Sequence, residues 1–229
     1  MKLTNITHVF FDLDHTLWDF DKNSALTFEY IFKKNKLDVE LDNFLEIYIP
    51  INMKYWENYR KNLIEKEDLR HGRLKDTFNA MSVSVSDEII DTLSTDYITH
   101  LSSFNYLLDG GFEALDYLKS KYKLHIITNG FSEVQHRKMS NANIIEYFDT
   151  ITSSEEAGVK KPHPAIFELS LKKAGAKPEN SVMIGDNYEA DILGAEDSGL
   201  QTIYFDYYKK YAVNHKRHID SLSNLSKFL

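Results

Sequence analysis

Two carboxylates one residue apart, Asp12 and Asp14, lie at the end of a largely apolar run at residues 9–13. Such a run is typical of a short buried strand, so the charged side chains emerge where the strand ends. In an open α/β sheet, ligands bind at that edge. One carboxylate can attack a small substrate there while the other moves a proton, and an aspartate nucleophile helped by Mg²⁺ is one way to hydrolyse phosphate esters. The simpler alternative is a strand end followed by a helix cap and solvated acids.

A second strand-like run, at residues 124–128, ends in a hydroxyl, an amide and a glycine: Thr128, Asn129 and Gly130. A threonine hydroxyl and backbone N–H groups at a strand-to-helix turn suit a phosphate oxygen. Further along, Lys161 precedes Pro162 and a helix that we expect at residues 164–174. A fixed ammonium in that place can hold both a nucleophilic carboxylate and a transferring phosphoryl group.

A fourth segment combines a strand at residues 181–185 with two acids, Asp186 and Asp191. Together with the first pair, these acids offer the oxygen-only ligand set that Mg²⁺ prefers. Each of the later segments also has a purely structural explanation, such as a turn threonine, a solvated lysine or acids in the first turn of a helix. Because polar groups follow one strand after another, we favour one shared site at the sheet edge.

The four segments together resemble the four motifs of the haloacid dehalogenase superfamily of phosphohydrolases, and the resemblance spans nearly the whole chain. The resemblance is closer to the YjjG/YfnB-like branch, nucleotidases that act on nucleoside monophosphates. It is carried by the stretches DLDHTLWDF, ITNGFSEVQHRKM, EEAGVKKPHPAIF and GDNYEADILGA.

This resemblance implies a catalytic role for three residues. Asp12 would be the nucleophile, Asp14 the general acid and base, and Lys161 the lysine of the third motif, since the family places that lysine directly before proline. His15 and His163 depart from the pattern, because many relatives have glycine at the first position and an acid at the second. Neither departure removes a catalytic group, so both bear on substrate preference more than on chemistry.

The resemblance also implies the binding groups. Mg²⁺ would be held by Asp12, the backbone carbonyl of Asp14 and Asp186, while Asp191 would act through water or by holding Lys161. The substrate would be bound by residues of the first two motifs, which are Thr16, Thr128, Asn129 and Gly130.

Composition excludes several classes of function. The chain has 229 residues, of which 42% are hydrophobic and 27% charged, and its net charge is −8 without a basic stripe. We therefore expect a globular protein whose partner is a small phosphorylated substrate rather than a nucleic acid polymer. The absence of cysteine excludes disulfides and thiolate chemistry. With no membrane-length apolar run and a strand close to the N-terminus, we expect a cytoplasmic protein that binds no membrane. We expect it to be a monomer or a homodimer.

The order of the elements predicts an α/β fold. Strand-like runs at 9–13, 124–128, 181–185 and 202–205 alternate with helical patterns at 131–142, 164–174 and 188–198, which indicates a parallel sheet covered on both faces. Between them, apolar residues recur at helical spacing and no strand is evident. We expect a Rossmann-like core at residues 1–18 and 105–229, with an all-helical cap domain at 19–104 inserted after the first strand.

The expected cap contains side chains that a nucleotide could use. Phe20, Tyr55, Trp56 and Tyr59 are candidates to stack on a base, although most such rings belong to a hydrophobic core. An arginine of the segment at 70–73 is a candidate to reach the substrate, against the alternative of surface ion pairs.

The sequence thus predicts a Mg²⁺-dependent phosphomonoesterase with an aspartyl-phosphate intermediate, acting on nucleoside monophosphates. Three alternatives stay open. A sugar-phosphate phosphatase or phosphomutase would share the carboxylate pair and the cap. A 2-haloacid dehalogenase would not need Asp14, because halide leaves without a proton. A binding module that has lost turnover would lack a catalytic group, and none is missing here.

Overall fold

A six-stranded parallel sheet organises the chain in a computed structural model that describes residues 2–210 and 212–229. The strand order is β3-β2-β1-β4-β5-β6, and every neighbouring pair runs parallel. The prediction of a Rossmann-like α/β fold is therefore confirmed. The strands are β1 His8–Phe11, β2 Lys123–Thr128, β3 Phe148–Ser153, β4 Ser181–Gly185, β5 Gln201–Phe205 and β6 His218–Ile219.

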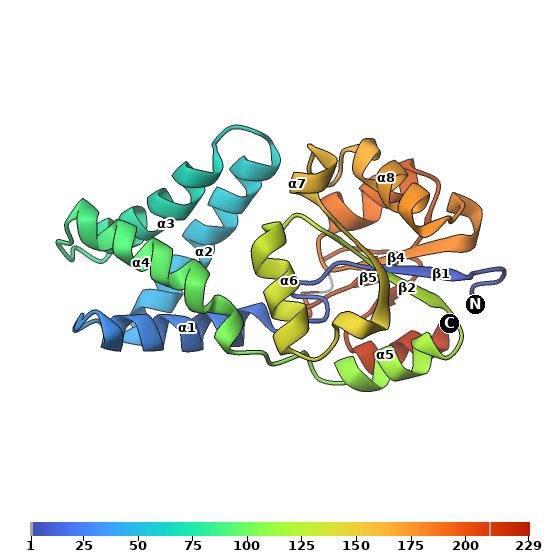
Figure 1. Cartoon of the computed structure of the whole chain (residues 1–229), viewed down its shortest axis with the longest axis horizontal. Helices are drawn as coiled ribbons and strands as arrows, with labels where there is room; N and C mark the ends of the chain where they lie inside the picture. Colours follow the sequence, from blue (N-terminus) through green and yellow to red (C-terminus); the bar gives the residue numbers. More distant parts are fainter. Residues whose placement is uncertain (1, 211) are drawn as a thin grey trace. The chain divides into compact units, whose positions relative to one another are not determined.

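The first strand lies in the middle of this sheet (Figure 1). Its four residues are all buried, as expected for a parallel strand with both faces covered. Phe11 is in register with Ile126 of β2 and Ile184 of β4. Whatever follows β1 therefore emerges between the ends of two neighbouring strands.

Helices cover both faces of the sheet, with α5 and α8 on opposite sides (Figure 1). The helix α8 begins after His163, whose ring accepts the N–H of Ala165 at 3.2 Å, and ends at Gly175, which has φ 62°. Proline at its first position and glycine at its end are favoured there. The α-helices after residue 105 are α5 Gly111–Lys119, α6 Ser132–Asn141, α7 Ser154–Ala157, α8 Pro164–Ala174 and α9 Gly194–Asp197. Shorter 3-10 turns span Leu101–Ser103, Ile145–Tyr147, Pro178–Asn180 and Leu222–Lys227.

Several elements differ from the sequence prediction. The first strand ends at Phe11 rather than at residue 13, because the chain turns at Leu13, whose carbonyl accepts three N–H groups from residues 16–18. The helix expected at 188–198 consists of a π-helical turn, Tyr188–Leu193, followed by α9. The strands β3 and β6 and the helix α5 were not anticipated.

The chain divides into two compact units. One contains Met1–Phe20 and Asn105–Leu229, and the other contains Asp21–Phe104. The second unit is all-helical among its described residues, and its core is a cluster of aromatic rings. Its helices are α1 Phe20–Lys34, α2 Leu41–Arg60, α3 Lys66–Ala80 and α4 Asp87–His100. Its buried rings include Phe28, Phe44, Tyr48, Phe78 and Tyr97.

Over the part of the chain that the structure describes, no helix combines the length and the apolar composition that a bilayer crossing requires.

Candidate active site

Asp12 is the first residue after β1. Its backbone N–H donates to the carbonyl of Ile184 in the neighbouring strand β4 at 2.9 Å, so its position is fixed by the sheet itself. The residue is only 8% exposed, which leaves its carboxylate with little water. A buried charge of this kind requires partners.

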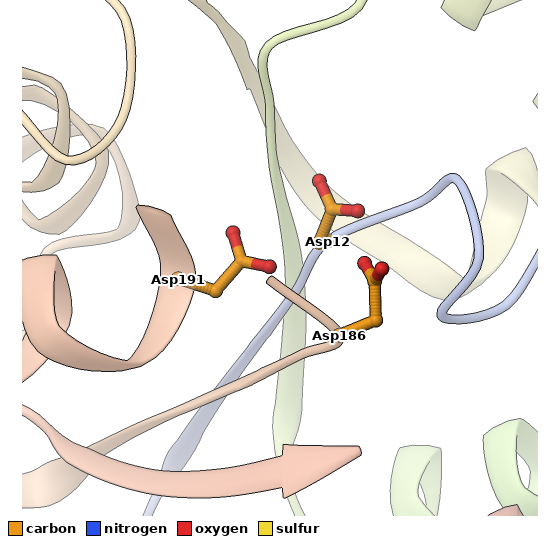
Figure 2. A group of neighbouring side chains, drawn as sticks. All are labelled: Asp12, Asp186 and Asp191. Atoms are coloured by element: carbon orange, nitrogen blue, oxygen red, sulfur yellow. The ribbon is translucent and has the colours of Figure 1, made fainter. Parts of the chain in front are cut away.

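Two further carboxylates face Asp12 from the segment after β4. Oxygen atoms of Asp12, Asp186 and Asp191 all lie within 4.8 Å of one another, and Figure 2 shows the three side chains grouped around one space. The backbone of Gly185 allows this approach, since a Cβ there would lie 2.5 Å from the Cβ of Asp191. The acids that the sequence placed at separate strand ends are thus brought together.

The clustering disfavours the charged forms of these acids. Burial first, and then the neighbouring charges of Asp191 and Asp186, raise the pKa of Asp12 to about 8 against the opposing effect of Lys161. Burial likewise raises the pKa of Asp186 to about 7, with His15 opposing it and Asp191 adding to it. A divalent cation at this place would relieve the repulsion, and three carboxylates without sulfur or nitrogen ligands fit a hard ion such as Mg²⁺.

Lys161 joins two of these carboxylates. Its Nζ lies 2.6 Å from Asp12 Oδ1, 2.6 Å from Asp191 Oδ1 and 2.7 Å from the carbonyl oxygen of Ile127. The ammonium donates hydrogen bonds to Asp12 and to the Ile127 carbonyl, and Asp191 is its second ion-pair partner. Burial opposes its charge, but Asp12 and Asp191 outweigh that effect and raise the pKa of Lys161. The ammonium is therefore a fixed positive charge beside Asp12.

Asn129 holds the backbone of Lys161 in place. Its Nδ2 donates to the Lys161 carbonyl at 3.0 Å, and its Oδ1 accepts the Lys161 N–H at 2.8 Å. The sequence predicts that Asn129 binds the substrate, whereas its side chain contacts the loop that carries the lysine. We propose that its amide positions Lys161.

Thr128 ends β2 and is 1% exposed. Its Oγ1 accepts the N–H of Gly130 at 3.0 Å and the Nε2 of Gln135 at 2.7 Å. Two donors occupy both lone pairs of the hydroxyl, so its own proton is the part that remains to be donated. The hydroxyl proton is therefore suited to donation to a phosphate oxygen. The N–H of Gly130, in contrast, already donates to Thr128.

Thr16 is fully buried and contacts Asp186 rather than open space. Its Oγ1 accepts the backbone N–H of Asp186 at 3.1 Å and donates to Asp186 Oδ1 at 3.4 Å. We therefore propose that Thr16 orients a metal-binding acid instead of touching the substrate. The preceding residue, His15, has φ 60°, a left-handed conformation that explains why glycine is suited to this position.

The side chain of Asp14 is directed to a different set of partners. Lys138 Nζ lies 2.7 Å from its Oδ1, and Gln135 Nε2 lies 2.9 Å from its Oδ2. Both partners come from α6, and neither was predicted from the sequence. The only available signal was two polar residues three positions apart on one helical face, which surface residues also show.

The aromatic and basic candidates of the sequence analysis are mostly structural. Phe20 is 8% exposed and packs against His15 and Trp18, with ring centroids 5.0 and 6.1 Å away. Arg73 is 2% exposed, donates to Asn52 at 2.8 Å and lies 4.9 Å from the centroid of the Tyr97 ring. Arg73 therefore belongs to the interior of the helical unit, which fits neither a substrate contact nor a surface ion pair.

The tyrosines and tryptophan on α2 differ in exposure. Tyr59 is 7% exposed, whereas Tyr55 and Trp56 are half-buried. Tyr55 donates from its hydroxyl to Asp76 at 2.7 Å, and its ring covers Gly72, where a Cβ would lie 2.6 Å from the hydroxyl oxygen. Of these rings, Tyr55 and Trp56 retain surface with which to contact another molecule.

Comparison with known proteins identifies the family to which the chain belongs. The model of the haloacid dehalogenase-like hydrolase family matches residues 6–199, and the chain belongs to this family of hydrolases. The predicted resemblance is thereby confirmed, and so is the prediction of an enzyme.

Two similar proteins have different activities. One is the pyrimidine 5′-nucleotidase YjjG of Escherichia coli, 32% identical over 86% of this chain and 84% of the relative. Another is a glyceraldehyde 3-phosphate phosphatase of Methanothermobacter thermautotrophicus, also 32% identical, over 85% of this chain and 83% of the relative.

Two solved structures of other proteins have the same fold as this chain. The hydrolase YfnB from Bacillus subtilis, crystallised with bound magnesium, has a TM-score of 0.86 at 23% identity, and the match covers 97% of each chain. The L-2-haloacid dehalogenase Rha0230 has a TM-score of 0.77 at 14% identity, with 99% of this chain and 98% of the other covered. Likeness at these identities shows the shared fold, so the choice between phosphate and halide chemistry depends on the site.

Proposed function

We propose that this hydrolase is a phosphomonoesterase that forms an aspartyl-phosphate on Asp12. The predicted class, a phosphoric monoester hydrolase, is confirmed by relatives that are nucleotidases and phosphatases. The observation that supports the residue roles most strongly is the placement of Asp12, held by the sheet and by Lys161 beside two further carboxylates. A nucleophile, a fixed cation and a metal-binding group thereby meet at one point.

In the first step, an oxygen of Asp12 bonds to phosphorus as the bond between phosphorus and the ester oxygen breaks. Asp14 gives its proton to that oxygen, which leaves as an alcohol. Lys161 and the hydroxyl of Thr128 stabilise negative charge on the phosphoryl oxygens. An alkoxide is a poor leaving group, so the proton from Asp14 matters most for alkyl esters.

In the second step, Asp14 acts as a base. It removes a proton from a water molecule whose oxygen bonds to phosphorus, and the bond to Asp12 breaks. Phosphate leaves, and both aspartates return to their starting states. The same carboxyl group thus acts as a general acid in the first step and as a general base in the second.

Asp12, Asp186 and Asp191 are the side chains that would hold or surround Mg²⁺, and the carbonyl of Asp14 is a further candidate ligand. When bound, the ion supplies positive charge that offsets the negative charge of the carboxylates and the phosphoryl group. Asp191 is 1% exposed and paired with Lys161, so we propose that its main role is to hold the lysine.

We propose a pyrimidine nucleoside monophosphate as the substrate class. The support is the similarity to a pyrimidine 5′-nucleotidase, together with half-buried aromatic rings in the inserted helical unit, Tyr55 and Trp56. A triose phosphate is the second candidate, since a glyceraldehyde 3-phosphate phosphatase is equally similar. A dehalogenase is disfavoured because Asp14, held by two partners, is unnecessary for expelling halide.

A substrate panel tests this proposal. Purified protein with Mg²⁺ would be assayed for phosphate release from dUMP, dTMP, glyceraldehyde 3-phosphate, hexose phosphates and p-nitrophenyl phosphate, and for chloride release from 2-chloropropionate. We expect the highest kcat/KM for a pyrimidine nucleotide. Stacking of the base on one aromatic ring would contribute about 1–3 kcal/mol to binding. If sugar phosphates had a kcat/KM about tenfold higher than every nucleotide, the proposed substrate class would be overturned. The phosphatase chemistry would stand, because it does not depend on the base. Product analysis separates hydrolysis from phosphoryl transfer within a sugar.

The contact with the base has its own test. Replacing Tyr55 or Trp56 with leucine should lower kcat/KM for nucleotides and leave p-nitrophenyl phosphate nearly unchanged, because the small ester needs the core site alone. Equal losses for both substrates would remove these rings from a role in specificity.

A further inference from the structure

Lys138 is a buried lysine in a helix that carries none of the expected catalytic residues. It lies near the end of α6 and is 2% exposed. Lysine is almost never fully buried without a partner, because its ammonium loses hydration. Its partner is Asp14, with Nζ 2.7 Å from Oδ1.

Aromatic rings also lie close to this ammonium. The Nζ lies 4.2 Å from the centroid of Trp18 and 5.3 Å from that of Phe20, both within the range of a cation–π interaction. Phe20 and Trp18 follow Asp14 in the chain, so the lysine contacts three residues of the same segment. The ammonium is thereby confined to one position.

Gln135 holds the second oxygen of the same carboxylate. Its Nε2 lies 2.9 Å from Asp14 Oδ2 and 2.7 Å from Thr128 Oγ1, and the residue is 1% exposed. Gly130 leaves room for it, since a Cβ there would lie 2.4 Å from this nitrogen. The amide therefore links the acid–base group to the hydroxyl proposed to bind phosphate.

We propose that Lys138 and Gln135 are positioning residues for Asp14. Each oxygen of the carboxylate has its own donor, one charged and one neutral, and both donors are fixed by burial in one helix. They orient Asp14, because each donor fixes the direction of one of its two oxygens. This role rests on the proposed function, in which Asp14 is the general acid and base.

The role predicts a dependence on the leaving group. General acid catalysis contributes about 10²–10⁴ to an ester with a poor leaving group, whereas p-nitrophenolate leaves without a proton. Lys138→Met should therefore slow formation of the phosphoenzyme from dUMP by about tenfold or more, and from p-nitrophenyl phosphate by less than about threefold. KM should change less than kcat, and Lys138→Arg should restore part of the rate.

The experiment measures single-turnover rates with both esters in wild type, Lys138→Met, Lys138→Arg and Asp14→Asn, and in the double variant of Asp14→Asn with Lys138→Met. If the lysine acts through Asp14, the double variant should be no slower than Asp14→Asn alone. Arg137→Met is the matched control, because it removes an exposed cation from the same helix. We expect it to keep the wild-type rates with both esters.

Equal losses with both esters, or a further loss in the double variant, would overturn the positioning role and indicate a structural one. If Asp14→Asn itself were fully active, the proposed function would fail. If Asp14→Asn were slow while Lys138→Met behaved as wild type, only the positioning role would fail. Should Lys138→Met not fold, as judged by thermal denaturation, Lys138→Gln, which keeps a hydrogen-bond donor but removes the charge, carries the same comparison of the two esters.

Discussion

His125, in the centre of the sheet, should make the stability of this protein depend on pH. Its ring is 1% exposed and packs 4.6 Å from the ring of Phe10. Its two nitrogens lie 2.9 Å from His8 Nδ1 and 2.9 Å from Thr150 Oγ1. Burial, followed by the neighbouring His8, lowers the pKa of His125 to about 4 from its usual 6.5.

The direction of this pH dependence follows from comparing the protonation of His125 in the folded and the unfolded chain. Above pH 6.5 the ring is neutral in both the folded and the unfolded chain, so it adds no pH dependence. Between pH 6.5 and about 4, the unfolded chain binds a proton at His125 and the folded chain does not, so the free energy of unfolding decreases as the pH falls. At pH 5 this loss is about 2 kcal/mol, or about 1–2 kcal/mol once screening by the polar groups around the ring is allowed for.

Urea denaturation of wild type and His125→Gln at pH 8 and pH 5 measures this effect. We expect the difference in unfolding free energy between the two pH values to be smaller in the variant by about 1–2 kcal/mol. The carboxylate cluster also titrates, but it is present in both proteins and cancels from the comparison. Thr150→Val is the control, since it removes one of the two hydrogen bonds of the His125 ring and no titrating group. The same pH difference in His125→Gln as in wild type would refute this reasoning.

Three further changes probe the site. Asp12→Asn should lower kcat by at least about a thousandfold, because an amide oxygen is a poor nucleophile, while the melting temperature in EDTA holds or rises as repulsion is relieved; retained turnover would exclude the role. Chelation with EDTA should abolish phosphate release and added Mg²⁺ should restore it, whereas full activity after dialysis against chelator would contradict the metal site. Gly185→Ala should displace Asp191 and cost about 1–3 kcal/mol in urea denaturation together with a loss of kcat, and an unchanged enzyme would show that the close approach is dispensable.

The site residues that could be predicted are those that lie in short sequence segments at the ends of predicted strands. Asp12, Thr128 and Asp186 each come at or directly after the end of a strand, and the ends of parallel strands meet at one edge of a sheet. Their approach to one another therefore follows from the fold class alone. The approach of Lys161 follows less directly, because it depends on a loop that Asn129 holds.

The partners of Asp14 could not be predicted in the same way. Gln135 and Lys138 are separated from it by more than a hundred positions, and which face of α6 turns toward Asp14 depends on tertiary packing. Burial also changes the meaning of a residue type, as Arg73 shows, since a basic side chain in a polar stretch of helix lies inside the aromatic core. The strand β3 was missed because three of its residues are half-buried and its pattern is irregular.

The most direct test of the central claim is the identification of the covalent intermediate. Asp14→Asn would be mixed with p-nitrophenyl phosphate and quenched in acid, then reduced with borohydride, which converts an acyl phosphate into the alcohol, and analysed by mass spectrometry. Because this variant should form the phosphoenzyme and hydrolyse it slowly, we predict that Asp12 is recovered as homoserine. Release of p-nitrophenol without reduction of Asp12, or with reduction at another aspartate, would contradict the assignment of Asp12 as the nucleophile.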